Sequence, residues 1–131
     1  MDLKLELVPM SVTDVDRAKG FYADVLGFVV DVDVRPADGV RVVQLTPPGS
    51  ACSIGLGTGL PAYDSMPPGS TKGLHLVVAD IERVRTELIE RGADVGAIVD
   101  VGGGVKHAWL SDPDGNTLTL QEMPWRTGAA S

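Results

Sequence analysis

The sequence predicts an α+β fold in which paired βαβββ modules form a curled mixed sheet around a cleft, with the helices on the outer face. Two stretches, residues 11–28 and 74–92, share one pattern: an aspartate near a helix start, an amphipathic helix and a glycine that ends it. A third signal is the turn sequence DPDGN at residues 112–116, whose flanks alternate apolar and small polar residues. Asp112 can accept hydrogen bonds from backbone N–H groups and Gly115 can take a positive φ, so this segment predicts a β-hairpin.

The first module is predicted to span residues 1–57 and to begin with a strand at residues 3–11. Thr13 or Asp14 can cap the helix that follows, and the helical spacing of its apolar side chains continues to about Val25. Three further strands complete the module, and they are expected at residues 28–34, 40–45 and 51–56.

The second module is predicted at residues 73–122 and repeats the order of the first. A strand at residues 74–79 precedes a helix that Asp80 caps and that runs to Arg91. The inner face of this helix is expected to carry Ile81, Val84, Leu88 and Ile89. Before the closing hairpin we expect a short strand at residues 95–99 and a flexible glycine connection at 102–104.

Two segments lie outside the modules, although the whole chain is expected to be one structural domain. Residues 58–72 form a connecting loop rich in glycine and proline, too long for a simple turn. We expect it to join the modules and to lay apolar side chains, including Tyr63, over a site. Residues 123–131 form a C-terminal tail. Its Trp125 is a candidate, with Tyr63 and Trp109, to stack against a planar ligand.

Composition limits the classes of function that the chain can have. It has 131 residues, 44% of them hydrophobic, which is ample for a packed interior. The net charge of −7 provides no basic surface for phosphates, so no nucleic-acid partner is expected. The single cysteine, Cys52, excludes an internal disulfide. There is no charged-then-apolar leader and no apolar run of about 20 residues, so we expect a cytoplasmic protein without a membrane partner.

Two motifs together carry a family resemblance: the run D-x-x-R-A-x-x-F-Y at residues 14–22, followed by L-G-F at 26–28, and the DPDGN turn. With them, residues 3–122 resemble the vicinal-oxygen-chelate superfamily, the fold of glyoxalase, bleomycin-resistance proteins and extradiol dioxygenases. The resemblance implies a cleft that holds metal and substrate and that a neighbouring subunit often completes. A homodimer is therefore expected.

The same resemblance implies where a metal would be bound. Members that do chemistry usually hold a divalent ion through histidine and glutamate, one ligand from each of four strands. When the two motifs are aligned without gaps, the ligand positions of the family correspond to Leu7, Gly55, Leu74 and Thr119. None of these can hold a divalent cation, so no metal is expected. No Ser-His-Asp spacing, glycine-rich phosphate loop or pair of carboxylates stands out, so neither another cofactor nor a catalytic residue is expected.

A shift of one residue in register keeps a metal site open as an alternative. It would bring in ligand-type neighbours of these positions, namely Glu6, His75 and Glu122. Such a shift sends alternate side chains of a strand to the opposite face, and in residues 74–79 both alternating sets are apolar enough that the pattern does not decide. His107, just past the glycine run, is interpreted as a surface or rim residue.

The inferred lining of the cleft is apolar, with a few neutral polar groups, as in pockets for aromatic or polyketide-like molecules. Gly55, without a side chain, is expected to leave room where a carboxylate stands in relatives. A closed core filled by the same residues is the alternative. The expected ligand-binding residues are Leu7, Pro9, Ser53, Gly55, Tyr63, Leu74, Leu76, Trp109, Thr119, Gln121 and Trp125.

The resemblance and the missing ligands favour a metal-free small-molecule-binding protein. It would sequester an apolar or aromatic natural product or antibiotic, and so confer self-resistance of the bleomycin-resistance type. One alternative is a divalent-metal-dependent lyase, isomerase or dioxygenase that uses His75, Glu122 and Glu6. The other is a dimeric regulatory or scaffold domain without a ligand.

Overall fold

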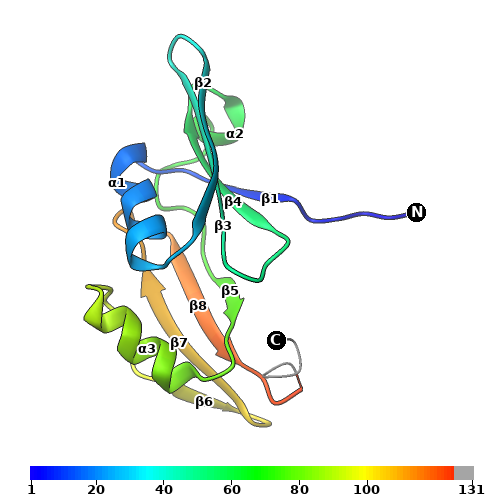
Figure 1. Ribbon diagram of the computed structural model, residues 1–131, viewed down its shortest axis with the longest axis vertical. Helices are drawn as coiled ribbons and strands as arrows, with labels where there is room; N and C mark the ends of the chain where they lie inside the picture. Colours follow the sequence, from blue (N-terminus) through cyan, green and yellow to red (C-terminus); the bar gives the residue numbers. More distant parts are fainter. Residues whose placement is uncertain (126–131) are drawn as a thin grey trace. The chain divides into compact units, whose positions relative to one another are not determined.

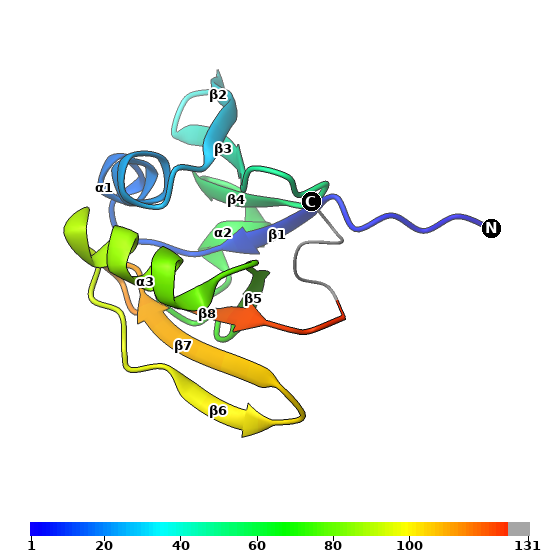
Figure 2. The same ribbon diagram turned by 60° about the horizontal axis from the view of Figure 1, so that its bottom comes forward.

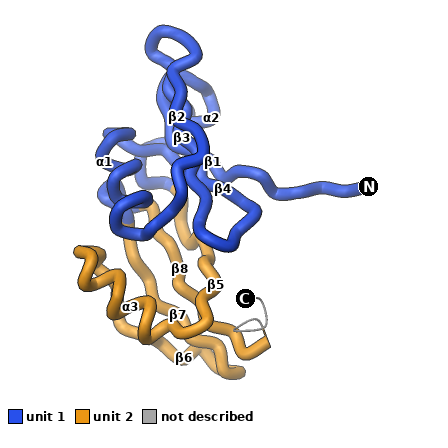
Figure 3. Tube along the Cα trace, in the orientation of Figure 1, with its two compact units in different colours: residues 1–70, 112–115 blue, residues 71–111, 116–131 orange. Residues whose placement is uncertain are grey.

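The computed structural model describes residues 1–125 (Figure 1). The chain divides into two compact units, one formed by Met1–Ser70 with Asp112–Gly115 and the other by Thr71–Ser111 with Asn116–Ser131 (Figure 3). Each unit carries one four-stranded mixed sheet, in the strand orders β1-β4-β3-β2 and β5-β8-β7-β6. In both sheets one pair of strands is parallel, β1 with β4 and β5 with β8. The α+β fold of two βαβββ modules is confirmed.

The elements follow one another in the predicted order. Those of the first unit are β1 (Leu7–Met10), α1 (Val15–Gly20), the π-helix η1 (Phe21–Val25), β2 (Val29–Ala37), β3 (Val40–Thr46), β4 (Ser53–Thr58) and α2 (Pro61–Asp64). Those of the second are β5 (Leu74–Val77), α3 (Ile81–Glu90), β6 (Val99–Gly102), β7 (Val105–Ser111) and β8 (Thr117–Glu122). No helix in this described part of the chain is long and apolar enough to cross a membrane.

Both long helices begin at the predicted caps. The Asp14 carboxylate accepts a hydrogen bond from the Arg17 backbone N–H at 3.1 Å, and Asp80 accepts one from the Arg83 N–H at the same distance. Each carboxylate satisfies a donor that the first turn leaves without a helical partner. The first helix then widens into η1, and Gly27 ends it with a φ of 76°.

The structure differs from the expectation in four segments and at one further residue. The connecting loop contains the one-turn helix α2, and the first strand begins at Leu7 rather than at residue 3. The expected strand at residues 95–99 is reduced to a single bridge, and β6 follows it in the chain. The glycine run at 102–104 is a tight turn between β6 and β7, because all three residues take positive φ. Ile89 is exposed on α3 and does not belong to the inner face.

Each sheet has one face covered by a helix and one opposite face, here called the far face. In the first unit α1 covers the buried side chains of Met10, Val43, Leu45 and Leu56. In the second unit α3 lies along β7 and β8, over Leu118 and Leu120 (Figure 2). The alternation of side chains along each strand then fixes which residues belong to the far faces.

The DPDGN turn is tied to the first helix by hydrogen bonds, of which the one from Tyr22 is buried. The Tyr22 hydroxyl, fully buried, donates to Asp112 Oδ2 at 2.9 Å, and Asp112 Oδ1 accepts from the Asp114 N–H at 2.9 Å. Asp114 in turn accepts from the Thr13 hydroxyl at 2.6 Å. Burial, and next the charge of Asp112, raises the pKa of Tyr22 well above its ordinary range. The turn therefore contributes to the core of the first unit.

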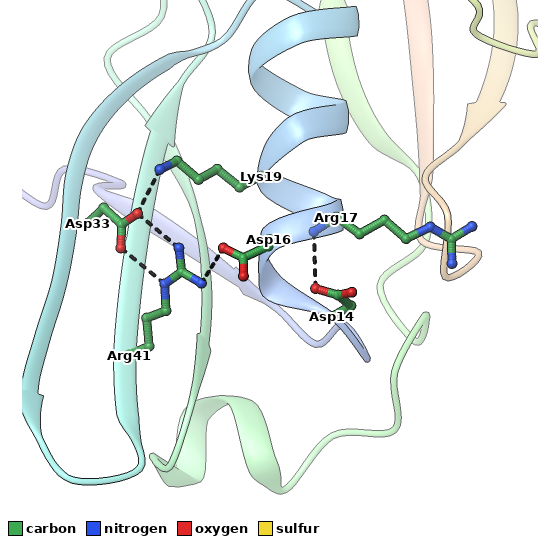
Figure 4. A network of polar contacts seen from close by, with 6 residues as sticks. All are labelled: Asp14, Asp16, Arg17, Lys19, Asp33 and Arg41. Carbon is green, nitrogen blue, oxygen red and sulfur yellow. Dashed lines mark hydrogen bonds and ion pairs between the residues drawn. The ribbon is translucent and has the colours of Figure 1, made fainter.

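A network of ion pairs joins α1 to β2 and β3 (Figure 4). The Arg41 side chain, only 9% exposed, pairs with Asp16 at 2.6 Å and with Asp33 at 3.0 Å. Lys19 adds a second contact to Asp33 at 2.7 Å. Hydrogen bonds from Arg41, and then from Lys19, hold the pKa of Asp33 well below its usual range.

We predict that Tyr22→Phe lowers the free energy of unfolding by about 1–3 kcal/mol, because it removes a buried hydrogen bond to a carboxylate. Urea denaturation at pH 7 measures this. Tyr63→Phe is the matched control, since the Tyr63 hydroxyl makes no hydrogen bond with any described residue; its change should be below about 0.5 kcal/mol. Equal effects of the two substitutions would contradict the role given to Tyr22.

We also predict that Asp33→Asn destabilises the protein more at pH 7 than in acid. The stabilisation from Asp33 is complete above its ordinary pKa of 3.8 and is lost as the pH falls through the lower value of the folded state. The gap in unfolding free energy between the wild type and the variant should thus shrink between pH 7 and about pH 2. Asp38→Asn, in the exposed turn between β2 and β3, is the control. A gap that is constant with pH would exclude this contribution.

Candidate functional site

The register of β8 determines the far face of the second sheet. Thr119 of β8 lies opposite His75 of β5 on one side and Trp109 of β7 on the other. Gln121 likewise lies between Val77 and His107. Side chains two residues apart on a strand share a face, so these six residues lie together, opposite the face that α3 covers. We call this set the second far face: His75, Val77, His107, Trp109, Thr119 and Gln121.

Three rings form the surface of the second far face. The ring centroids of His75 and His107 are 5.5 Å apart with the planes at 87°, and His107 lies 6.4 Å from Trp109. Thr119, in the middle strand, is only 2% exposed between these larger neighbours. Trp109 itself is 50% exposed. A large aromatic ring is thus partly exposed beside an imidazole, which suits contact with another flat apolar group.

The two imidazoles are held in place by hydrogen bonds within the unit. His75 Nδ1 lies 2.6 Å from the carbonyl oxygen of Gly73, and His107 Nε2 lies 2.7 Å from Oε1 of Gln121. An amide nitrogen of Gln121 in turn donates to the sulfur of Met123. Both rings are therefore oriented by neutral groups and not by a carboxylate, the partner that raises the basicity of a histidine in catalytic sites.

The first sheet has its own far face, on which the predicted residues also meet. Leu7 lies opposite Ser53, and Pro9 lies opposite Gly55, so all four share one face. The predicted room at Gly55 is absent, because Tyr63 of α2 occupies it. A Cβ at Gly55 would lie 2.6 Å from the Tyr63 hydroxyl oxygen.

Tyr63 packs closely over β4 and is itself only 4% exposed. At Gly57 an added Cβ would lie 2.7 Å from the tyrosine ring. Burial raises the pKa of the Tyr63 hydroxyl. The two glycines thus serve to admit the tyrosine ring, and the connecting loop covers this part of the first sheet.

Leu74 and Leu76 were assigned to the wrong face. They lie opposite Leu118 and Leu120 and so belong to the face that α3 covers. Their neighbour His75 takes the far-face position. Because both alternating sets of β5 are apolar enough to be buried, the sequence pattern carried no signal for this register. His107, interpreted as a rim residue, lies within the second far face.

The remaining candidates lie away from the second far face. Glu122 lies opposite Lys106 in register, and its Oε1 accepts a hydrogen bond from the Ile81 N–H at the start of α3, at 3.0 Å. It therefore projects to the side opposite His75. Glu6 precedes β1 and accepts from the Gln44 amide at 3.1 Å. Trp125 is exposed in the turn after β8.

The residues at the family's metal positions do not fit a divalent ion. With the register of β5 corrected, these positions hold Leu7, Gly55, His75 and Thr119, of which one imidazole is a suitable ligand. Among residues 1–125 there is no group of three histidine, cysteine, aspartate or glutamate side chains that could hold an ion. The far face offers aromatic surface and neutral hydrogen-bonding groups instead.

Paired βαβββ modules with a far face on each sheet define a glyoxalase-type fold. The sequence profile of the Glyoxalase/Bleomycin resistance protein/Dioxygenase superfamily matches residues 4–120, and the chain belongs to this superfamily. No curated protein sequence matches the chain significantly.

Solved structures of the same superfamily are similar to the chain over nearly its whole length. The antibiotic binding protein TnmS3 from Streptomyces sp. CB03234 is 32% identical, with a TM-score of 0.81, over 93% of this chain and 97% of that one. A glyoxalase/bleomycin resistance protein from the same organism is 33% identical (TM-score 0.75; 89% and 98% covered). A superfamily member from Sphaerobacter thermophilus DSM 20745 is 31% identical (TM-score 0.80; 92% and 98% covered).

We predict that Gly57→Ala is more destabilising than Gly55→Ala. The added methyl group at Gly57 would lie 2.5 Å from the backbone oxygen of Arg41, which cannot move without disturbing β3, whereas at Gly55 it meets the end of the Tyr63 side chain. A loss of about 1–3 kcal/mol in unfolding free energy is expected for Gly57→Ala, measured by urea denaturation. If Gly55→Ala proves the more damaging, the packing described for Tyr63 is incorrect.

Proposed function

We propose that this protein is a metal-free small-molecule-binding protein that sequesters an apolar or aromatic natural product or antibiotic, as in self-resistance. The observation that carries the proposal is the half-exposed Trp109 ring beside His107 on the second far face, which His75 shares. The similarity to an antibiotic binding protein at 32% identity over 93% of the chain supports it.

The chemistry of the second far face favours holding a planar molecule. Stacking on an aromatic side chain contributes about 1 kcal/mol beyond the burial of area, and the half-exposed Trp109 offers part of its ring system. Val77 extends the apolar surface, while His75, His107 and Gln121 supply a small number of polar groups that fix orientation. Apolar area with a few placed polar groups is the usual composition of a ligand site.

Metal-dependent lyase, isomerase or dioxygenase activity is the second candidate, and the far-face position of His75 is what favours it. Its proposed partner Glu122 is directed to the other face and bonded to the N-terminus of α3, which counts against it. Elemental analysis of the purified protein separates the two functions. Stoichiometric nickel, zinc, manganese or iron would favour the enzyme.

A homodimer in the cytoplasm is part of the same proposal. The edge strand β2 exposes Val29, Val32 and Val34, and exposed apolar side chains in a row are typical of surfaces that meet a partner. A second copy of the chain is the partner that the family resemblance favours. The cytoplasmic location stays a prediction from the sequence.

We predict that Trp109→Ala weakens the binding of an aromatic antibiotic at least about tenfold, equivalent to about 1.4 kcal/mol, because the stacking surface is lost. A thermal-shift screen of planar antibiotics, with doxorubicin as the first probe, identifies a ligand, and isothermal titration calorimetry measures its affinity. Ile89→Ala is the control, since this exposed residue of α3 lies on the helix that covers the opposite face. Full affinity in Trp109→Ala would overturn the site.

A further inference from the structure

We propose that the ligand carries phenolic hydroxyl groups, and that His75 and His107 accept hydrogen bonds from them while the ring system stacks on Trp109. This inference rests on the proposed function and names the chemical class of its ligand. It follows from which nitrogen of each imidazole carries the proton. Neutral histidine has one donor and one acceptor nitrogen, and the fixed neighbour of one nitrogen determines the role of the other.

For His75 the neighbour is a backbone carbonyl. The oxygen of Gly73 can only accept, so Nδ1, at 2.6 Å, must carry the hydrogen. The lone pair of the neutral ring is then on Nε2, which makes no hydrogen bond with any described residue. Because His75 is exposed, this acceptor is accessible on the second far face.

For His107, the position of the ring proton follows from the contacts of two further residues, Gln121 and Met123. The thioether sulfur of Met123 has no hydrogen to donate, so the NH₂ group of Gln121 is the end of the amide that faces it. The amide oxygen of Gln121 consequently faces His107 Nε2, at 2.7 Å, and that nitrogen must be the donor. The acceptor lone pair of His107 is then on Nδ1, which also has no partner among residues 1–125. Met123 and Gln121 are thus positioning residues for His107.

The two imidazoles therefore present acceptors to a molecule on Trp109. Their ring centroids lie 5.5 Å apart, so hydroxyl groups on one fused ring system can serve both. A phenolic hydroxyl can donate a hydrogen bond to such an imidazole nitrogen. A methyl ether or a carbonyl has no hydrogen to donate, so its oxygen lone pair would face the lone pair of the nitrogen. Sites built to hydrogen-bond a hydroxyl strongly reject the analogue that lacks it.

Two matched probes test the inference, 2,6-dihydroxynaphthalene and 2,6-dimethoxynaphthalene. Quenching of Trp109 fluorescence at pH 8 measures binding, in a Trp125→Phe background that leaves Trp109 as the remaining tryptophan. We expect the dihydroxy compound to bind at least about tenfold more tightly than its dimethyl ether. In His107→Phe, which keeps a ring but removes the acceptor, this preference should fall while the affinity for the ether is retained.

The outcomes separate the inference from the function on which it rests. Equal binding of the two probes by the protein with intact histidines would overturn the phenol preference and leave aromatic binding in place. If neither probe binds, the second far face does not take aromatic molecules and both proposals fail. Met123→Leu adds a readout for positioning: loss of the amide orientation should reduce the preference between the probes without weakening the binding of the ether.

Discussion

The pairing of β8 with β5 and β7 is the constraint on which the properties of the second unit depend. Side chains alternate strictly along a strand, so the pairing that places Thr119 between His75 and Trp109 also sends Leu118 and Leu120 beneath α3. If the pairing of these strands shifted by one residue, the far face of the sheet would carry aliphatic side chains in place of the aromatic rings. The register is fixed because the leucines bury their area only when they face the helix.

The two units use the same arrangement of elements for different surfaces. In the first, Gly55 and Gly57 admit the ring of Tyr63, and the far face of that sheet is partly covered by the chain itself. In the second, Trp109 stays half-exposed, and the polar groups beside it are oriented by neutral partners. Several acidic groups are engaged elsewhere, in helix caps and in the ion pairs of Arg41.

The sequence was sufficient where structure is determined by local chemistry. The cap at Asp80 and the hairpin turn that begins at Asp112 were predicted correctly, and Asp14 was one of the two candidates for the first cap, because each depends on side chains within a few residues. The face of β5 was predicted incorrectly. Its two alternating sets of side chains, one with Leu74 and one with His75, are both apolar enough to be buried, and only the pairing with β8 decides which set faces the helix. The closure of Gly55 by Tyr63 depends on a contact between a strand and a loop that no local pattern encodes. The spacing of Gln121, in β8, and Met123, directly after it, was the available signal for the orientation of His107.

Nuclear magnetic resonance of the side chains on the second far face tests the central claim most directly, because the chain has only two histidines and two tryptophans. On titration with a planar aromatic antibiotic, the imidazole resonances of His75 and His107 and the indole N–H of Trp109 should shift together with one saturation curve. The backbone amides of α3, on the other side of the sheet, should stay in place. Saturable shifts confined to α3, with the three rings unchanged, would contradict a ligand site on this face.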